Sequence, residues 1–185
     1  MDTHITTYSG LDFDPIHPEE QKIQLTDIAH ALSRICRGNG HVKTFYSVAQ
    51  HCLQAAAEAK AQGLSPLLQL AALLHDASEC YLSDVPHPVK QVLPDYCCIE
   101  DRILESVYHR FLGRVLTPEE AHQVKAIDTA LLHSDLYHLL HGAQVEDGDN
   151  ALYLAVDYTV LPFEVVTQAY EKKAKELLAN FTECP

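Results

Sequence analysis

Cap residues and glycines divide this chain into segments whose apolar residues recur at helical spacing. The clearest helix start is Thr117-Pro118-Glu119-Glu120, which has proline at the first helical position and glutamate three residues after the threonine. Ser65 and Pro66 form a second start, and glycine follows several segments at the place where a left-handed residue ends a helix. The pattern predicts helices over residues 26–37 (with Thr26 as the N-cap), 47–62, 65–80, 95–112, 117–140 and 162–180.

The rest of the chain is consistent with a helical fold. Residues 1–24 form an arm that contains Pro and Asp, and its residues 4–8 are the candidate for a short strand. Residues 143–150 have the composition of a polar loop, and residues 151–161 are apolar and β-branched enough to fit either helix or strand. We expect an all-α protein, with a single helical bundle over residues 25–185 that follows the arm over residues 1–24.

The charge of the chain restricts its partners. There are 13 Lys and Arg against 26 Asp and Glu, a formal net charge of −13, which disfavours a nucleic acid polymer or an anionic membrane as partner. A small polyanion remains compatible with a few local cations. The N-terminal residues show no secretion signal, and no apolar run approaches the roughly 18 residues of a membrane span. We therefore expect a cytoplasmic protein whose six cysteines are reduced.

Twelve histidines make metal binding the first functional hypothesis. His51, His75, Asp76 and Asp128 lie in predicted helices among apolar neighbours, where a polar side chain requires a partner. Two imidazoles and two carboxylates suit one divalent ion, and Mn, Co, Fe, Ni, Mg and Zn all accept such ligands. Asp135 lies seven residues after Asp128 on the same helix face and is the alternative fourth ligand.

Three motifs then point to a family. The runs S-V-A-Q-H-C (47–52), H-D-A-S-E (75–79) and L-S-D-V-P-H-P-V-K (82–90) resemble the HD superfamily of metal-dependent phosphohydrolases. The resemblance covers about residues 25–140 and is nearest to the small bacterial and phage branch that contains the 5′-deoxynucleotidases. It implies an all-helical bundle and the same four metal ligands that the burial pattern selects.

The resemblance also implies roles for further residues. Glu79 and Asp76 are the expected catalytic residues, with Glu79 moving protons beside the metal. The implied substrate-binding residues are Arg37, Asp84, which would contact the sugar 3′-hydroxyl, and Lys90. Two positions depart from the family pattern. Gly38 follows Arg37 where the deoxynucleotidases carry Trp, which leaves Phe45 or Tyr46 to supply an aromatic platform for the base or sugar. Gln50 stands where the family frequently has Glu.

The sequence thus predicts a metal-dependent phosphohydrolase that hydrolyses deoxyribonucleoside 5′-monophosphates to nucleoside and phosphate, as a homo-oligomer of two or more chains. Two alternatives stay open. One is a triphosphohydrolase that releases triphosphate from a deoxyribonucleoside triphosphate. The other is a regulatory module that binds a metal and a nucleotide without turnover.

Overall fold

The strongest caps in the sequence are the ones that begin the long helices. In the computed structural model, which describes residues 3–142 and 151–182, α7 (Pro118–Leu139) begins at a capping box. Thr117 Oγ1 accepts from the backbone N–H of Glu120, and the Glu120 carboxylate accepts from that of Thr117. Ser47 and Gln50 form the same box at the start of α2 (Val48–Ala61). The position that departs from the family pattern, Gln50, therefore has a structural role.

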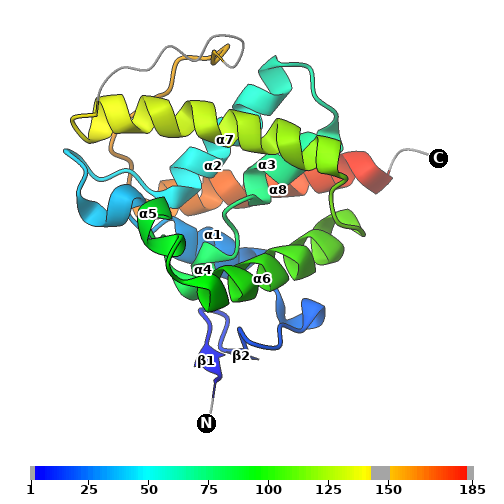
Figure 1. Ribbon diagram of the computed structural model, residues 1–185. Helices are drawn as coiled ribbons and strands as arrows, with labels where there is room; N and C mark the ends of the chain where they lie inside the picture. The colour runs from blue at the N-terminus through cyan, green and yellow to red at the C-terminus, as the bar shows by residue number, and fades with distance from the viewer. Residues whose placement is uncertain (1–2, 143–150, 183–185) are drawn as a thin grey trace.

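Helix α3 (Pro66–Leu74) lies at the centre of the molecule and contacts α2, α6 (Pro94–Leu112), α7 and α8 (Phe163–Thr182). Its sequence is apolar on all sides, which is typical of a helix that is buried all round. Leu70, Leu73 and Leu74 are fully buried. In Figure 1, α7 crosses the upper part of the molecule and α6 the lower part, with α3 and α8 between them and strands β1 and β2 below α6. The predicted all-α class is confirmed, and the protein is a single helical domain.

Three predicted helix boundaries are wrong, namely both ends of the first helix and the end of the helix predicted over residues 65–80. Helix α1 (Leu25–Leu32) begins after Gln24, so Thr26 lies inside the helix and does not cap it. The helix predicted over residues 65–80 ends at Leu74, and the chain passes through a turn at residues 75–78 before α4 (Glu79–Leu82). Backbone bonds of the tighter i to i+3 type, Ala77 N–H to Leu74 O and Glu79 N–H to Asp76 O, replace the helical ones there.

Shorter elements complete the structure. The first helix does not extend to residue 37, because η2 (Arg37–Gly40) is a separate 3₁₀ turn. The short helix α5 (His87–Lys90) lies within the proline-containing run over residues 82–90. Asn39 in η2 has a φ of 53° and Gly38 one of 59°, which explains a Gly-Asn-Gly sequence at this turn.

The N-terminal arm packs against the same core. Strand β1 (Ile5–Thr6) pairs antiparallel with β2 (Asp12–Phe13), in agreement with the predicted short strand, and η1 (Glu20–Lys22) follows. Phe13 and Ile23 are fully buried members of the hydrophobic core. Asp27 of α1 accepts from the backbone N–H of Ser9 at 2.6 Å and from its hydroxyl at 2.9 Å. These contacts fix the arm to α1.

The sequence of residues 151–161 fits either a helix or a strand, but the segment forms neither. Buried groups of α2 hold this segment instead. The Glu58 carboxylate accepts from the backbone N–H groups of Tyr153 and Leu154, and Gln50 Nε2 donates to Thr159 O at 3.0 Å. The predicted loop at 143–150 lies outside the described residues. Within the described part of the chain, no helix is both long and apolar enough to cross a membrane.

The end of α3 depends on a buried hydrogen bond from α8. The Tyr170 hydroxyl is fully buried and donates to Leu73 O at 2.7 Å. We expect Tyr170→Phe to lower the free energy of unfolding by about 1–2 kcal/mol, because the carbonyl loses a buried donor. Chemical denaturation measures the change. Tyr153→Phe, at a residue that is 70% exposed, is the matched control. Equal stability of the two variants would contradict this role.

Candidate metal centre

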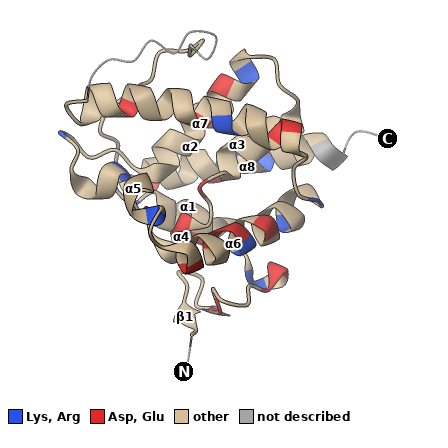
Figure 2. Ribbon diagram, viewed as in Figure 1, with Lys and Arg blue, Asp and Glu red and all other residues tan. Residues whose placement is uncertain are grey.

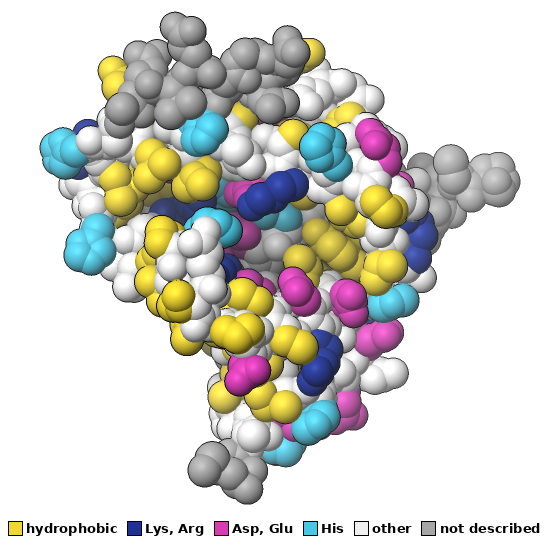
Figure 3. Space-filling view, in the orientation of Figure 1, with side chains coloured by type: hydrophobic (Ala, Val, Ile, Leu, Met, Phe, Trp, Pro, Cys, Tyr) yellow, Lys and Arg dark blue, Asp and Glu magenta, His cyan; other side chains and the backbone are white. Residues whose placement is uncertain are grey.

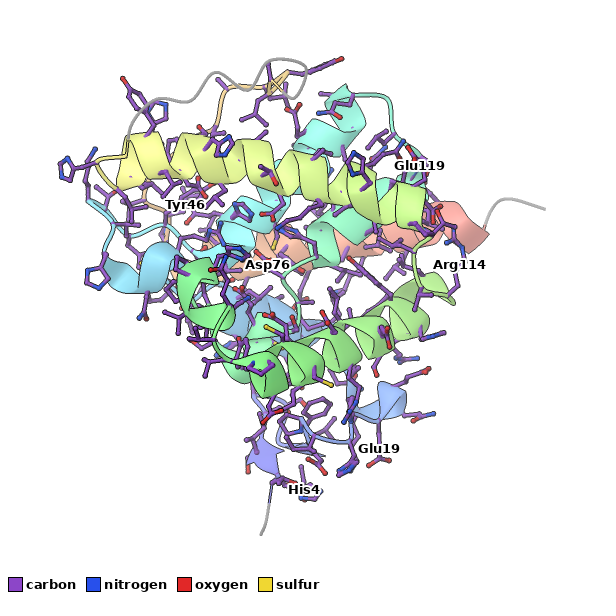
Figure 4. The ribbon with its side chains drawn as sticks, viewed as in Figure 1. His4, Glu19, Tyr46, Asp76, Arg114 and Glu119 are labelled. Atoms are coloured by element: carbon purple, nitrogen blue, oxygen red, sulfur yellow. The ribbon has the colours of Figure 1, made fainter. Side chains whose placement is uncertain are left out.

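Three side chains from two consecutive helices converge at the centre of the molecule. His51 belongs to α2, and His75 and Asp76 directly follow α3. One nitrogen from each ring and one Asp76 oxygen lie within 4.8 Å of one another, so that the group could hold a metal ion. Asp76 Oδ2 is 3.3 Å from His75 Nε2 and 3.8 Å from His51 Nε2. Figure 4 labels Asp76 in the space between α6 and α7.

The other nitrogen of each ring already has a partner. His75 Nδ1 donates to Ala72 O at 2.8 Å, and His51 Nδ1 lies 3.1 Å from Asp135 Oδ2. In a neutral imidazole with a proton on Nδ1, Nε2 carries the lone pair. His75 Nε2 is buried and makes no well-directed hydrogen bond to any residue that the structure describes. Two lone pairs that face one carboxylate are suited to a bound cation, and the donor set therefore fits a divalent metal.

Asp128 of α7 approaches the same two nitrogens. Its Oδ1 lies 3.1 Å from His51 Nε2 and 3.4 Å from His75 Nε2. Its Oδ2 accepts from Lys125 Nζ at 2.7 Å. Asp135 lies on the opposite side of the His51 ring, at Nδ1. The two alternatives for a fourth ligand thus have different positions, with Asp128 beside the Nε2 atoms of His51 and His75 and Asp135 beside Nδ1 of His51.

The carboxylates and imidazoles shift one another's pKa values. Burial works against the imidazolium form of His75, but Asp76, Cys52 and Asp128 together outweigh it and hold the pKa of His75 well above its ordinary value. Burial also works against the Asp76 carboxylate, and the nearby His75 and Arg37 cations keep its pKa well below the usual range. Burial likewise opposes ionisation of Asp128, and the hydrogen bond with His51, together with the nearby His75, lowers its pKa. Both carboxylates are therefore ionised, as a cation site requires. A bound metal ion would displace the proton that the raised pKa of His75 favours, because a ligand imidazole must be neutral.

Arg37 connects the centre to neighbouring carboxylates. Its guanidinium lies 3.5 Å from Asp76 Oδ2, 3.9 Å from Asp84 Oδ2 and 3.4 Å from Asp135 Oδ2. Asp135 is further fixed by the Tyr158 hydroxyl at 3.0 Å, from the irregular segment 151–161. Sequence reasoning missed this role of Tyr158, because no motif marks a residue that acts through a carboxylate on another helix.

Glu79 and Lys90 lie together beside Asp76 and Asp84. Glu79 is 3% exposed, and its Oε2 has no hydrogen-bond partner among the described residues. Burial, together with the charges of Asp76 and Asp84, raises the pKa of Glu79 well above its ordinary value. Lys90 Nζ lies 3.7 Å from Glu79 Oε1 and donates to Glu100 Oε1 at 2.6 Å.

A cavity of about 590 Å³ opens from His75, Asp76 and Asp128 into the space between α6 and α7. Figure 3 shows it as a hollow near the middle of the visible face, with hydrophobic side chains in its wall and acidic ones along its lower edge. Of the predicted site residues outside the metal group, Lys90 lines the cavity, whereas Arg37, Glu79 and Asp84 do not. Phe45 and Tyr46 do not line it either, and Tyr46 is fully buried.

The fold and site define a single-domain helical protein with a candidate His–His–Asp metal centre. No family model matches the chain. It is 38% identical over 133 residues to the uncharacterized protein YfdR of Escherichia coli (strain K12), a match that covers 71% of this chain and 69% of that protein. It is also 38% identical over 128 residues to the uncharacterized protein RCAP_rcc00048 of Rhodobacter capsulatus, which covers 65% of each chain. The chain belongs to the same family as YfdR.

Removal of one carboxylate tests the metal centre. We expect Asp76→Asn to lose bound Mn²⁺, because the substitution removes a negative charge that lies 3.3 Å from His75 Nε2 and 3.8 Å from His51 Nε2. Metal content after dialysis and the Mn²⁺-dependent rise in melting temperature measure the effect. The matched control is Asp157→Asn, at an exposed residue whose side-chain oxygen accepts from Thr159. Wild-type Mn²⁺ binding by Asp76→Asn would contradict the assignment.

Asp135 allows a graded prediction. Its carboxylate orients His51, so we expect Asp135→Asn to weaken Mn²⁺ binding by about 10–100-fold while the protein remains folded. Calorimetric titration with Mn²⁺ gives the ratio. Tyr158→Phe removes one hydrogen bond to Asp135 and leaves the carboxylate, and a smaller loss is expected. Affinity that is unchanged in both variants would show that Asp135 does not act on the centre.

Proposed function

We propose that this protein is an HD-superfamily metal-dependent phosphohydrolase that hydrolyses deoxyribonucleoside 5′-monophosphates to nucleoside and phosphate. The observation that carries the proposal is the convergence of two imidazole Nε2 atoms and two ionised carboxylates, of which His75, Asp76 and Asp128 line a cavity. The H-D-A-S-E motif supports it, since this motif supplies His75, Asp76 and the buried Glu79 from consecutive turns. We place this activity in the cytoplasm, where free cysteines such as the buried Cys52 persist.

In this proposal, Asp128 completes the ligand set with His51, His75 and Asp76. Two nitrogens and two carboxylates suit one divalent ion, which Mn, Co, Fe, Ni, Mg or Zn can supply. Bound there, the ion would stabilise charge on the phosphoryl group and lower the pKa of water at the site. Ala72 O and Asp135 hold the two imidazoles with their Nε2 atoms directed inward.

Local cations compensate for the net charge of −13 and hold the phosphate. Arg37 is 11% exposed. Burial alone would lower its pKa, but its carboxylate neighbours together raise it above the ordinary value, so that Arg37 remains charged. A phosphate at the metal ligands would take over part of the interaction that Arg37 makes with Asp76 and Asp84. Lys125, which pairs with Asp128 and is 72% exposed, is free to turn toward the same phosphate.

Glu79 is the proton-transfer group of the proposed reaction. Its buried carboxyl has a raised pKa and therefore holds a proton at a pH where an ordinary glutamate is ionised. Oε2, which lacks a hydrogen-bond partner within the described residues, is the atom available to give that proton to the leaving 5′-oxygen. By the resemblance, Asp84 accepts from the sugar 3′-hydroxyl, and Lys90 supports both the phosphate and Glu79.

The direct test measures phosphate release from a panel of nucleoside mono- and triphosphates with Mn, Co, Ni, Zn and Mg in turn. Inorganic phosphate from deoxyribonucleoside monophosphates supports the proposal. Release of intact triphosphate instead identifies a triphosphohydrolase. Absence of turnover in a protein that holds a metal and binds the nucleotide favours the regulatory module.

Glu79 distinguishes catalysis from binding. We expect Glu79→Gln, which keeps the size of the buried side chain, to lower kcat by about 10²–10⁴. Mn²⁺ affinity should change little, because Glu79 is not one of the proposed ligands. Steady-state kinetics and calorimetry give the two quantities. Glu19→Gln, at an exposed glutamate of the arm, is the control. An unchanged kcat would remove Glu79 from the reaction.

A further inference from the structure

The cavity beside the metal centre has an apolar end that the proposed chemistry does not use. From His75, Asp76 and Asp128 it extends along α6 and α7 to the connection between them. Its volume of about 590 Å³ is within the range of small-molecule sites, roughly 300–1,000 Å³. The apolar part of its wall comes from α6, the α6–α7 connection and α7, and consists of Leu104, Tyr108, Val115, Leu116, Ala121 and Val124.

The charged side chains of this cavity are mostly acidic away from the metal centre. Glu100, Asp101 and Glu105 of α6 line it, and Figure 2 shows acidic positions along this helix. Glu100 is paired with Lys90, but neither Asp101 nor Glu105 has an ion pair with any residue in 3–142 or 151–182. Both are exposed. Away from the metal ligands, the acidic side chains of the cavity therefore repel a second negatively charged group on a ligand.

We propose that the α6–α7 cavity binds the end of the leaving group that is farthest from the phosphate, and that this end is an apolar or aromatic group without negative charge. In a deoxyribonucleoside monophosphate it is the base. The inference rests on the proposed function, because it requires the phosphate to lie at His75, Asp76 and Asp128.

The physical reasons are independent of each other. An aromatic base that leaves water for a wall of Leu104, Leu116 and Val124 gains from apolar burial. A deoxyribonucleoside triphosphate whose terminal phosphate lies at His75, Asp76 and Asp128 would bring its other two phosphates into the cavity close to Asp101 and Glu105, where like charges repel. The cavity thus selects for the base and against additional phosphates.

A steric variant tests the position of the base. Ala121 is exposed on α7 and lines the cavity, so Ala121→Phe fills the apolar end without burying a new side chain in the core. The substrates are deoxyadenosine 5′-monophosphate and 2-deoxyribose 5-phosphate, which share the same phosphate ester and differ by the base. We expect Ala121→Phe to weaken binding of the nucleotide about tenfold and to leave the sugar phosphate unchanged.

Calorimetric Kd values with Mn²⁺, together with phosphate-release kinetics, give the result. Ala169→Phe, at an exposed residue of α8, is the control. Equal Kd and kcat/KM values for the two wild-type substrates would overturn the inference and leave the phosphohydrolase standing. Equal effects of Ala121→Phe on the binding of both substrates would also overturn the inference. If the wild-type protein neither binds nor hydrolyses any phosphate ester, the proposed function fails and the inference with it.

A charge variant tests the selection against triphosphates. Asp101→Asn with Glu105→Gln removes two like charges one helical turn apart and should not weaken α6. We expect this double variant to bind deoxyadenosine triphosphate about tenfold more tightly, with a smaller change for the monophosphate. Glu164→Gln with Glu176→Gln changes the net charge equally on α8. The inference is overturned if both double variants behave alike, or if the wild-type protein binds triphosphate as tightly as monophosphate.

Discussion

The burial of α3 on all sides is the constraint on which the rest of the structure depends. A helix with the sequence P-L-L-Q-L-A-A-L-L is stable in water only if other helices cover it, and α2, α6, α7 and α8 do so. The same burial places the two residues that follow α3, His75 and Asp76, inside the protein. The turn at 75–78, with His75 Nδ1 bound to Ala72 O, directs His75 Nε2 toward the carboxylates and away from the helix.

Buried charge then determines the arrangement around the centre. Each ionised carboxylate that enters the interior requires a nearby cation or donor, since an uncompensated buried charge is strongly destabilising. Asp76 and Asp135 share Arg37, Asp128 has Lys125, and Asp135 also has Tyr158. Tyr158 is positioned through a segment without regular structure, which Glu58 and Gln50 of α2 hold in place. The irregular residues 151–161 therefore belong to the support of the centre.

Much of the fold and part of the candidate site could be predicted from the sequence. Local signals were sufficient for α7 and α2, because their capping boxes involve residues only three positions apart. They failed at Thr26, where a good cap residue lies inside α1, and at Leu74, where apolar periodicity continues but the backbone turns. His51, His75 and Asp76, which the sequence grouped with Asp128 because a polar residue in an apolar helix face requires a buried partner, come together in a group that could hold a metal ion.

By itself, the sequence determined the helical class, most helix starts and the residue types of a metal site, because periodicity, caps and composition are properties of neighbouring residues. Only the tertiary structure placed Asp128 at the Nε2 atoms and Asp135 behind His51. Two carboxylates seven residues apart share a helix face, and only the packing of α7 against α2 and α3 distinguishes them. The cavity between α6 and α7 was likewise invisible in the sequence, because its wall comes from separate helices whose relative position depends on the core.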